Sequence, residues 1–92
     1  MNGLNLHQLY VFCVVARTGS FTRAAEELYI GQPAVSQHVA ALERVLGVPL
    51  VYRMGRGVRL TEAGRLAADY GERIFRLAEQ LRAGIADLKG LA

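Results

Sequence analysis

The chain of 92 residues is long enough for one small domain with a core of its own. Its single cysteine excludes an internal disulfide and a zinc site of the paired-cysteine type, and no apolar run approaches the ~20 residues of a membrane span. The net charge of +3 only weakly favours nucleic acid, but ten of the eleven cations are Arg, the residue best suited to phosphate and base-edge recognition.

Few residues are available for catalysis or for binding a metal. His7 and His38 are the only histidines; no nucleophile stands at a recognisable spacing from them, and we expect both at the surface. Cys13 lies in an apolar segment, which predicts a core thiol. We therefore expect no catalytic residue, no metal ligand and no cofactor in this chain, and no enzyme activity. The absence of a signal-peptide pattern at the N-terminus predicts a cytoplasmic protein.

The first half of the chain predicts three helices. Residues 5–17 are apolar almost all round, which is typical of a helix buried on every side; in so small a domain this predicts a helix packed between the core and another element or subunit. Ser20 can cap a second helix over 20–29, and Pro33 stands in the first turn of a third helix over 32–46, where its missing N–H costs nothing. Apolar residues at helical spacing predict the inward side of the third helix: Val35, Val39, Leu42 and Leu46.

Residues 50–60 predict a β-hairpin, because two short strands flank a tip that contains glycine. Thr61 can cap a final helix that runs to about Lys89. Apolar residues of this helix recur at the 3–4 residue spacing of a coiled-coil seam. We expect the seam to form a homodimer, since so long a helix extends past so small a domain; the alternative is a seam within the domain's own core. The seam residues are Leu66, Tyr70, Ile74, Leu77, Leu81, Ile85 and Leu88.

Taken in order, these elements predict a mainly α fold of the winged helix-turn-helix kind, with three helices and a two-stranded wing, followed by a long linker helix. Residues 1–60 are expected to form a DNA-binding domain whose wing covers residues 50–60. Residues 61–92 are expected to form the linker and dimerisation helix.

The outward side at the start of the third helix is short and polar and carries no acid. A recognition helix places its N-terminal residues at base edges in the major groove, where Gln pairs with adenine and a Ser hydroxyl donates or accepts. The alternative is that these are solvated surface residues. The expected base contacts are Gln32, Pro33, Ser36 and Gln37.

Arg56 stands between two glycines at the hairpin tip, with Arg53 and Arg59 on the flanking strands, and we expect all three to make backbone or minor-groove contacts with DNA. An Arg at a thin tip can enter a narrow minor groove; the alternative is a hairpin kept soluble by arginine. Because the hairpin follows the third helix at a suitable distance, the two together predict sequence-specific binding of double-stranded DNA. The competing hypothesis is a protein-interaction module. RNA binding is disfavoured, because the aromatic residues mostly lie at core spacing.

Several separated motifs, in the same order and spacing, resemble the N-terminal domain of LysR-type transcriptional regulators over essentially the whole chain. The motifs are GSFTRAAEEL (19–28), QPAVS (32–36), LE (42–43), LGVPL (46–50) and LTEAG (60–64).

The resemblance implies a bacterial transcription regulator that dimerises through its long helix and forms a tetramer in the full-length protein. It also implies a small-molecule effector bound by a C-terminal domain, which we expect to be absent from this chain. The base contacts of the family map to the residues named above, and its wing contact maps to Arg56. Thr22, Arg23 and Arg53 are then expected near the DNA backbone.

Three residues depart from the family pattern. Gly31 stands where Ser is usual, so the third helix is expected to lack a side-chain cap. Gln37 stands where Arg is common, which is expected to shift base preference from guanine towards adenine. Val51 replaces the usual Phe and is a smaller side chain beneath the wing.

Overall fold

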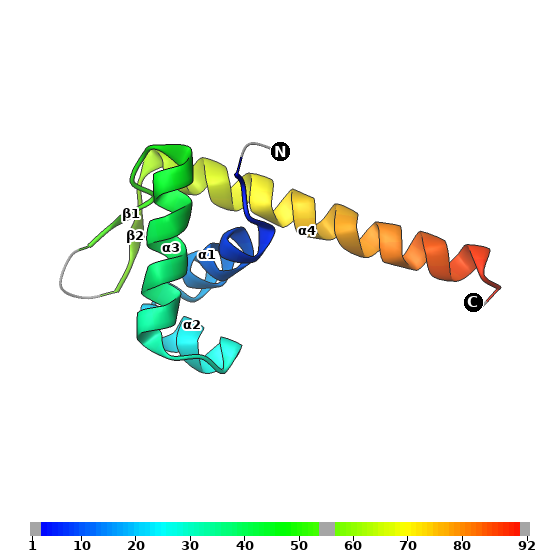
Figure 1. Ribbon diagram of the computed structural model, residues 1–92, viewed down its shortest axis with the longest axis horizontal. Coiled ribbons are helices and arrows are strands. Elements are labelled where there is room, and N and C mark those ends of the chain that lie inside the picture. Colours follow the sequence, from blue (N-terminus) through cyan, green and yellow to red (C-terminus); the bar gives the residue numbers. More distant parts are fainter. Residues whose placement is uncertain (1–2, 54–56, 91–92) are drawn as a thin grey trace.

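The computed structural model describes residues 3–53 and 57–90. In these residues a body of three helices carries a small antiparallel hairpin at one end, and a long fourth helix leaves the body (Figure 1). This arrangement confirms the predicted fold class. The elements are α1 Leu6–Thr18, α2 Phe21–Leu28, α3 Gln32–Leu46, β1 Val51–Tyr52, β2 Arg59–Leu60 and α4 Glu62–Leu88.

Short side-chain hydrogen bonds explain where α2 and α4 begin. The hydroxyl of Ser20 accepts from the backbone N–H of Arg23 at 3.1 Å, and the hydroxyl of Thr61 accepts from the N–H of Gly64 at 2.9 Å. Both are the N-caps expected from the sequence. Gly31 precedes α3 without a side-chain cap, also as expected, and has a φ of −73°.

The core lies where α1 packs against α3 and the first half of α4. Phe12 and Val15 of α1 are fully buried, as are Val35 and Val39 of α3. Each helix places these residues three or four positions apart, so they share one face. Packing on this face fixes the side of α3 that points away from the body.

Within the single chain, α1 is enclosed on one side only, since Leu6 and Tyr10 near its start are almost half exposed, and its predicted burial against another subunit stays a prediction. One predicted burial is wrong. Leu46 is 44% exposed rather than inward, because α3 ends at Gly47 and the following segment fills the core instead with the fully buried Leu50. Leu46 lines a shallow apolar hollow beside α4.

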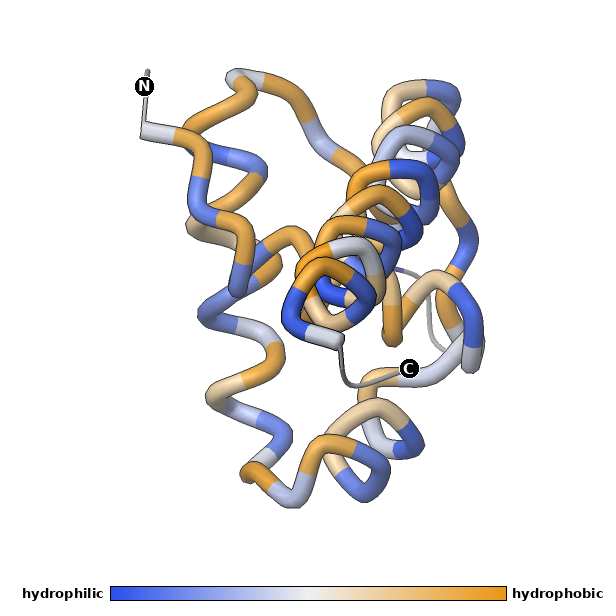
Figure 2. Tube along the Cα trace, turned by 90° about the vertical axis from the view of Figure 1, so that its right-hand side faces the viewer, coloured by the Kyte–Doolittle hydropathy of each residue, from blue (hydrophilic) through white to orange (hydrophobic). Residues whose placement is uncertain are grey.

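α4 crosses α1 closely at Gly71, where a Cβ atom would overlap the sulfur of Cys13. The rings of Tyr10 and Phe75 meet edge to face beside this crossing, with centroids 5.4 Å apart. Beyond Phe75, α4 projects away from the body (Figure 1). Figure 2, which looks nearly along α4, shows hydrophobic residues gathered on one side of the helix and hydrophilic residues on the other.

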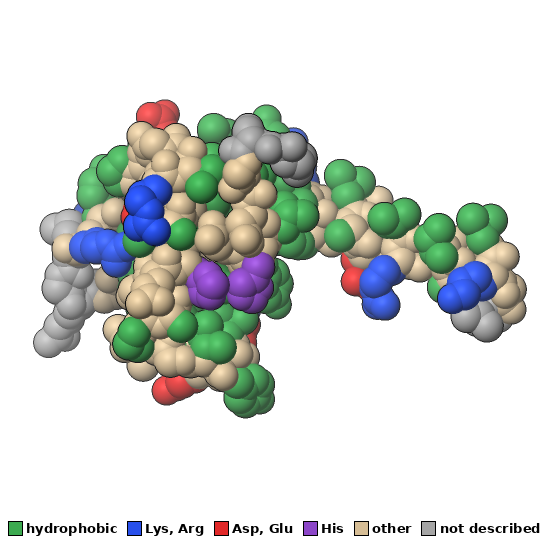
Figure 3. Space-filling view, in the orientation of Figure 1, with side chains coloured by type: hydrophobic (Ala, Val, Ile, Leu, Met, Phe, Trp, Pro, Cys, Tyr) green, Lys and Arg blue, Asp and Glu red, His purple; other side chains and the backbone are tan. Residues whose placement is uncertain are grey.

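The two histidines form a pair that the sequence did not predict. The rings of His7 in α1 and His38 in α3 meet edge to face, with centroids 4.9 Å apart, and lie together on one face of the body (Figure 3). His7 is exposed and His38 is half-buried, so the predicted surface location is correct. The pair joins the start of α1 to the middle of α3.

Candidate nucleic-acid interface

The start of α3 presents a polar side to solvent. Gln32, Pro33 and Gln37 are exposed, while Ser36 is half-buried. The opposite side of the helix is anchored by the buried valines of the core, so these four side chains point away from the body or along its edge. The first acid of α3 is Glu43, which leaves the first three turns free of negative charge.

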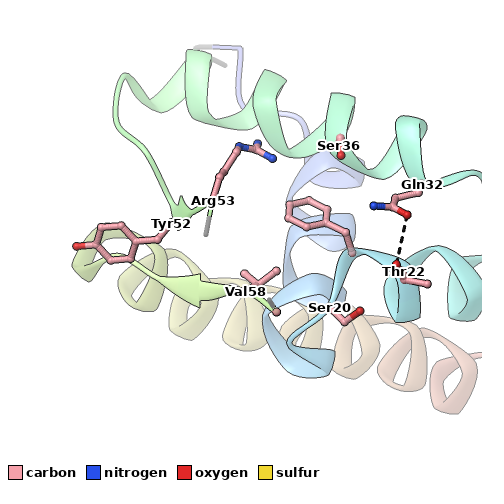
Figure 4. Close-up of a pocket in the computed structure, with 9 residues that line it drawn as sticks. Ser20, Thr22, Gln32, Ser36, Tyr52, Arg53 and Val58 are labelled. Carbon is pink, nitrogen blue, oxygen red and sulfur yellow. Dashed lines mark hydrogen bonds between the residues drawn. The ribbon is translucent and has the colours of Figure 1, made fainter. Parts of the chain in front are cut away.

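A cleft of about 420 Å³ separates the start of α3 from the hairpin. Figure 4 shows Gln32 and Ser36 on one wall and Tyr52, Arg53 and Val58 on the opposite wall. None of the described residues that line the cleft is acidic. Its polar groups are therefore suited to an electron-rich ligand, such as the base edges and phosphate oxygens of a nucleic acid.

Thr22 and Gln32, predicted to contact backbone and base respectively, contact each other. The hydroxyl of Thr22, in the first turn of α2, donates to the side-chain oxygen of Gln32 at 3.3 Å (Figure 4). Both residues are exposed and both line the cleft. The structure thus brings together the first turns of α2 and α3.

Arg53 is held at the cleft by two neighbours that sequence reasoning missed. Its guanidinium lies over the ring of Phe21, 5.3 Å from the centroid, and 3.6 Å from a carboxylate oxygen of Glu43. The other oxygen of Glu43 accepts from the backbone N–H of Leu50 at 2.8 Å and of Val51 at 3.4 Å. Glu43 thereby ties α3 to β1.

The remaining arginines predicted to contact DNA are not gathered in the cleft. Arg59 is exposed on β2, opposite Tyr52 in the antiparallel register. Arg23 lies over a separate hollow on α2, beside Glu26 and Glu27. Arg56 lies outside the residues that the structure describes.

The predicted dimerisation seam is mostly exposed along α4. Its exposed members are Leu66, Tyr70, Leu77, Leu81, Ile85 and Leu88. Ile74 differs, because it is partly buried against the core of the body. Figure 3 shows hydrophobic side chains along one edge of the projecting part of α4 and charged side chains along the other.

The groups that could carry catalysis or hold a metal are sparse in the described part of the chain. Burial raises the pKa of the Cys13 thiol to about 11, with a smaller contribution from the charge of Glu72, so this thiol is neutral at physiological pH. Residues 3–53 and 57–90 contain no cluster of three His, Cys, Asp or Glu side chains arranged to hold a metal ion. Across the same residues, no helix has both the length and the apolar character needed to cross a bilayer.

Known proteins resemble this chain in sequence and in fold. The HTH-type transcriptional activator CmpR of Synechocystis sp. is 50% identical over 91 residues, which cover 99% of this chain and 30% of CmpR. The DNA-binding domain of BenM, in a crystal structure with catB site 1 DNA, has a TM-score of 0.89 at 30% identity, covering 94% of this chain and 97% of that chain. The corresponding domain of CbnR, also solved with DNA, has a TM-score of 0.83 at 35% identity, covering 97% and 100%.

The chain therefore spans 30% of the length of CmpR but nearly all of the two DNA-binding domains. The family model described as the bacterial regulatory helix-turn-helix protein, lysR family, matches residues 6–65. That match covers more than half of the chain, and this protein belongs to the LysR family of bacterial regulatory helix-turn-helix proteins.

Proposed function

We propose that this chain binds double-stranded DNA in a sequence-specific manner, with α3 in the major groove and the wing in the adjacent minor groove. The main support for the proposal is that the start of α3 has an exposed polar side without acidic residues, and that this side lies next to the cleft and the hairpin. Exposed amides and a hydroxyl on α3 match base edges, and the arginines of the hairpin match phosphates. BenM and CbnR, whose DNA-binding domains have this fold, were solved with DNA.

Site residues in this proposal keep the roles expected from the sequence. Base contacts come from the start of α3, and backbone or minor-groove contacts come from α2 and the wing. The base-contacting group is Gln32, Pro33, Ser36 and Gln37, and the second group is Thr22, Arg23, Arg53, Arg56 and Arg59.

The proposal includes a homodimer on an inverted-repeat operator, joined through the seam of α4. Exposed leucines along a projecting helix support it, because monomeric proteins rarely leave such a stripe in water. In the longer regulator we propose a tetramer, and a small-molecule effector bound outside residues 1–92. The role of this chain is then transcriptional regulation in the cytoplasm without enzyme activity and without a cofactor of its own. The name of its relative CmpR, a transcriptional activator, supports this role.

Selection of bound sites from a random duplex library tests the proposal. We expect an inverted repeat with half-sites about one helical turn apart, because a two-fold dimer presents two recognition helices. Affinity should fall steeply with salt, since each phosphate contact releases counterions. Equal affinity for every duplex at physiological salt would contradict the proposal.

Two variants separate base contacts from backbone contacts. Gln37→Ala should cost about 1–3 kcal/mol at one base position and relax the preference there. Arg59→Ala should weaken binding to all duplexes alike and reduce the salt slope by about one. If Gln37→Ala instead weakened all sequences equally, Gln37 would not lie at a base edge.

A further inference from the structure

We propose that Thr22 is a positioning residue, which turns the side-chain amide of Gln32 so that Gln32 presents its NH₂ group to the DNA and selects guanine. This inference rests on the proposed function, since it assigns a base to one residue of the proposed interface. It differs from the adenine preference that a free Gln side chain predicts.

A hydrogen bond joins the side chains of Thr22 and Gln32. Thr22 donates its hydroxyl hydrogen to the side-chain oxygen of Gln32 at 3.3 Å. A hydroxyl has a single hydrogen, so while Thr22 donates to Gln32 it does not also donate to a phosphate. In this inference the role of Thr22 is to orient Gln32, and this role replaces the backbone contact that the family resemblance implies and that the proposed function keeps for it.

The amide nitrogen of Gln32 is the group left free to meet a ligand. Because the oxygen of this amide is engaged by Thr22, the nitrogen is turned the other way, and Figure 4 shows it pointing into the cleft, on the side of Ser36. The cleft also receives the guanidinium of Arg53, which can only donate. Each wall of the cleft thus presents a donor, the amide nitrogen of Gln32 on one and the guanidinium of Arg53 on the other, and the group that meets these donors has to be an acceptor.

Guanine and adenine differ in the hydrogen-bonding groups that they present in the major groove. Guanine presents two neighbouring acceptors in the major groove, N7 and O6, which suit the two hydrogens of one amide nitrogen. Adenine presents the acceptor N7 beside the donor N6–H₂, so a matched contact needs the amide nitrogen and the amide oxygen together. With its oxygen turned towards Thr22, Gln32 matches guanine better than adenine.

Duplex selection with the whole 92-residue chain and three variants tests the inference. Gln32→Ala identifies the base pair that Gln32 reads, because preference is lost there. At that pair we expect the wild-type chain to prefer guanine over adenine by about fivefold or more. Thr22→Ser keeps the hydroxyl and should keep the preference. Thr22→Val has nearly the same shape without the hydroxyl and should remove the preference or move it to adenine.

Each other outcome overturns the inference in a recognisable way. If Thr22→Val left the preference unchanged, Thr22 would not position Gln32. If it weakened binding to all duplexes evenly and reduced the salt slope, Thr22 would contact a phosphate. If Gln32→Ala changed no base position, Gln32 would not read a base, although sequence-specific binding itself would stand. If the wild-type chain selected no sequence at all, the proposed function would fail with the inference. Circular dichroism checks that each variant is folded, and Thr22→Ala replaces Thr22→Val if the valine variant is not.

Discussion

At the scale of single residues, Gly64 is, among the glycines that the structure describes, the one with the least room for a side chain. A Cβ atom at this position, in the first turn of α4, would overlap the backbone carbonyl oxygen of Leu50. Backbone atoms cannot move aside as a flexible side chain can. We expect Gly64→Ala to lower the free energy of unfolding by roughly 1–3 kcal/mol, measured by urea denaturation.

Gly31→Ser is the matched control, since it also adds a Cβ to a glycine at the start of a helix. That Cβ meets only the ring of Pro33, at an ordinary contact distance of 3.6 Å. The new hydroxyl can cap α3, which should raise stability by about a few tenths of a kcal/mol. A loss of stability in both variants would mean that adding a side chain, rather than the contact with Leu50, explains the first result.

Cys13 gives a pH-dependent prediction at the same scale. Its pKa of about 11 leaves about one thiol in a thousand ionised at pH 8, whereas an unfolded chain ionises roughly a quarter. Because the thiolate is the reactive form, a disulfide reagent should modify the native chain about a hundredfold more slowly than the chain in guanidinium. Stability should also decrease as the pH rises from about 9 towards 11, since the unfolded state loses this proton first. Equal rates of modification in the native and the unfolded chain would contradict the raised pKa of Cys13.

At the scale of elements, Glu43 is the link between α3 and the wing. Its carboxylate accepts from the backbone N–H of Leu50, a residue that is fully buried. Glu43→Ala leaves this N–H without its acceptor and should cost about 1–3 kcal/mol, again measured by urea denaturation. Glu43→Gln keeps an oxygen acceptor and should cost less. Full stability of the alanine variant would show that the N–H finds another partner.

At this scale the sequence could predict the features that depend on residues close together in the chain. The caps at Ser20 and Thr61, and the inward valines of α3, depend on residues three or four positions apart, so their pattern is visible in the chain. The exposure of Leu46 and the partial burial of Ile74 were not predictable in this way, because both depend on where a distant element docks.

In the candidate site, too, the sequence predicts the local features but not the contacts between distant residues. Helical spacing alone indicates that Gln32 and Gln37 lie on the outward side of α3. The contacts of Gln32 with Thr22 and of Arg53 with Glu43 join residues ten positions apart in the chain, each pair from two different parts of the fold. No periodicity in the sequence predicts such pairs, and only the packing of α2 and of the hairpin against α3 brings them together.

At the scale of the whole molecule, α4 determines the shape. Its 27 residues extend about 40 Å, in a molecule whose principal extents are 51, 28 and 19 Å. Leu81, in the projecting half, is 66% exposed in the single chain. Burial in a helix pair is worth roughly 1.5–3 kcal/mol for each large apolar side chain. We expect Leu81→Glu to make the chain monomeric and to abolish high-affinity operator binding, while weak non-specific DNA binding persists.

Gln80→Glu is the control for this variant, because it adds the same charge one position away, off the seam. It should remain dimeric. Sedimentation or light scattering at micromolar concentration measures both variants beside the wild-type chain. A wild-type chain that runs as a stable monomer would refute the dimer and, with it, the inverted repeat.

The pairing of His7 with His38 has a practical consequence for following this molecule in solution. These are the only two histidines in the chain, so their ring protons give a small set of proton NMR signals without isotope labelling. Each ring lies in the magnetic field of the other, because their centroids are 4.9 Å apart. A duplex that shifted α3 against α1 would move both sets of signals, whereas a duplex that docked on a rigid body would leave them in place.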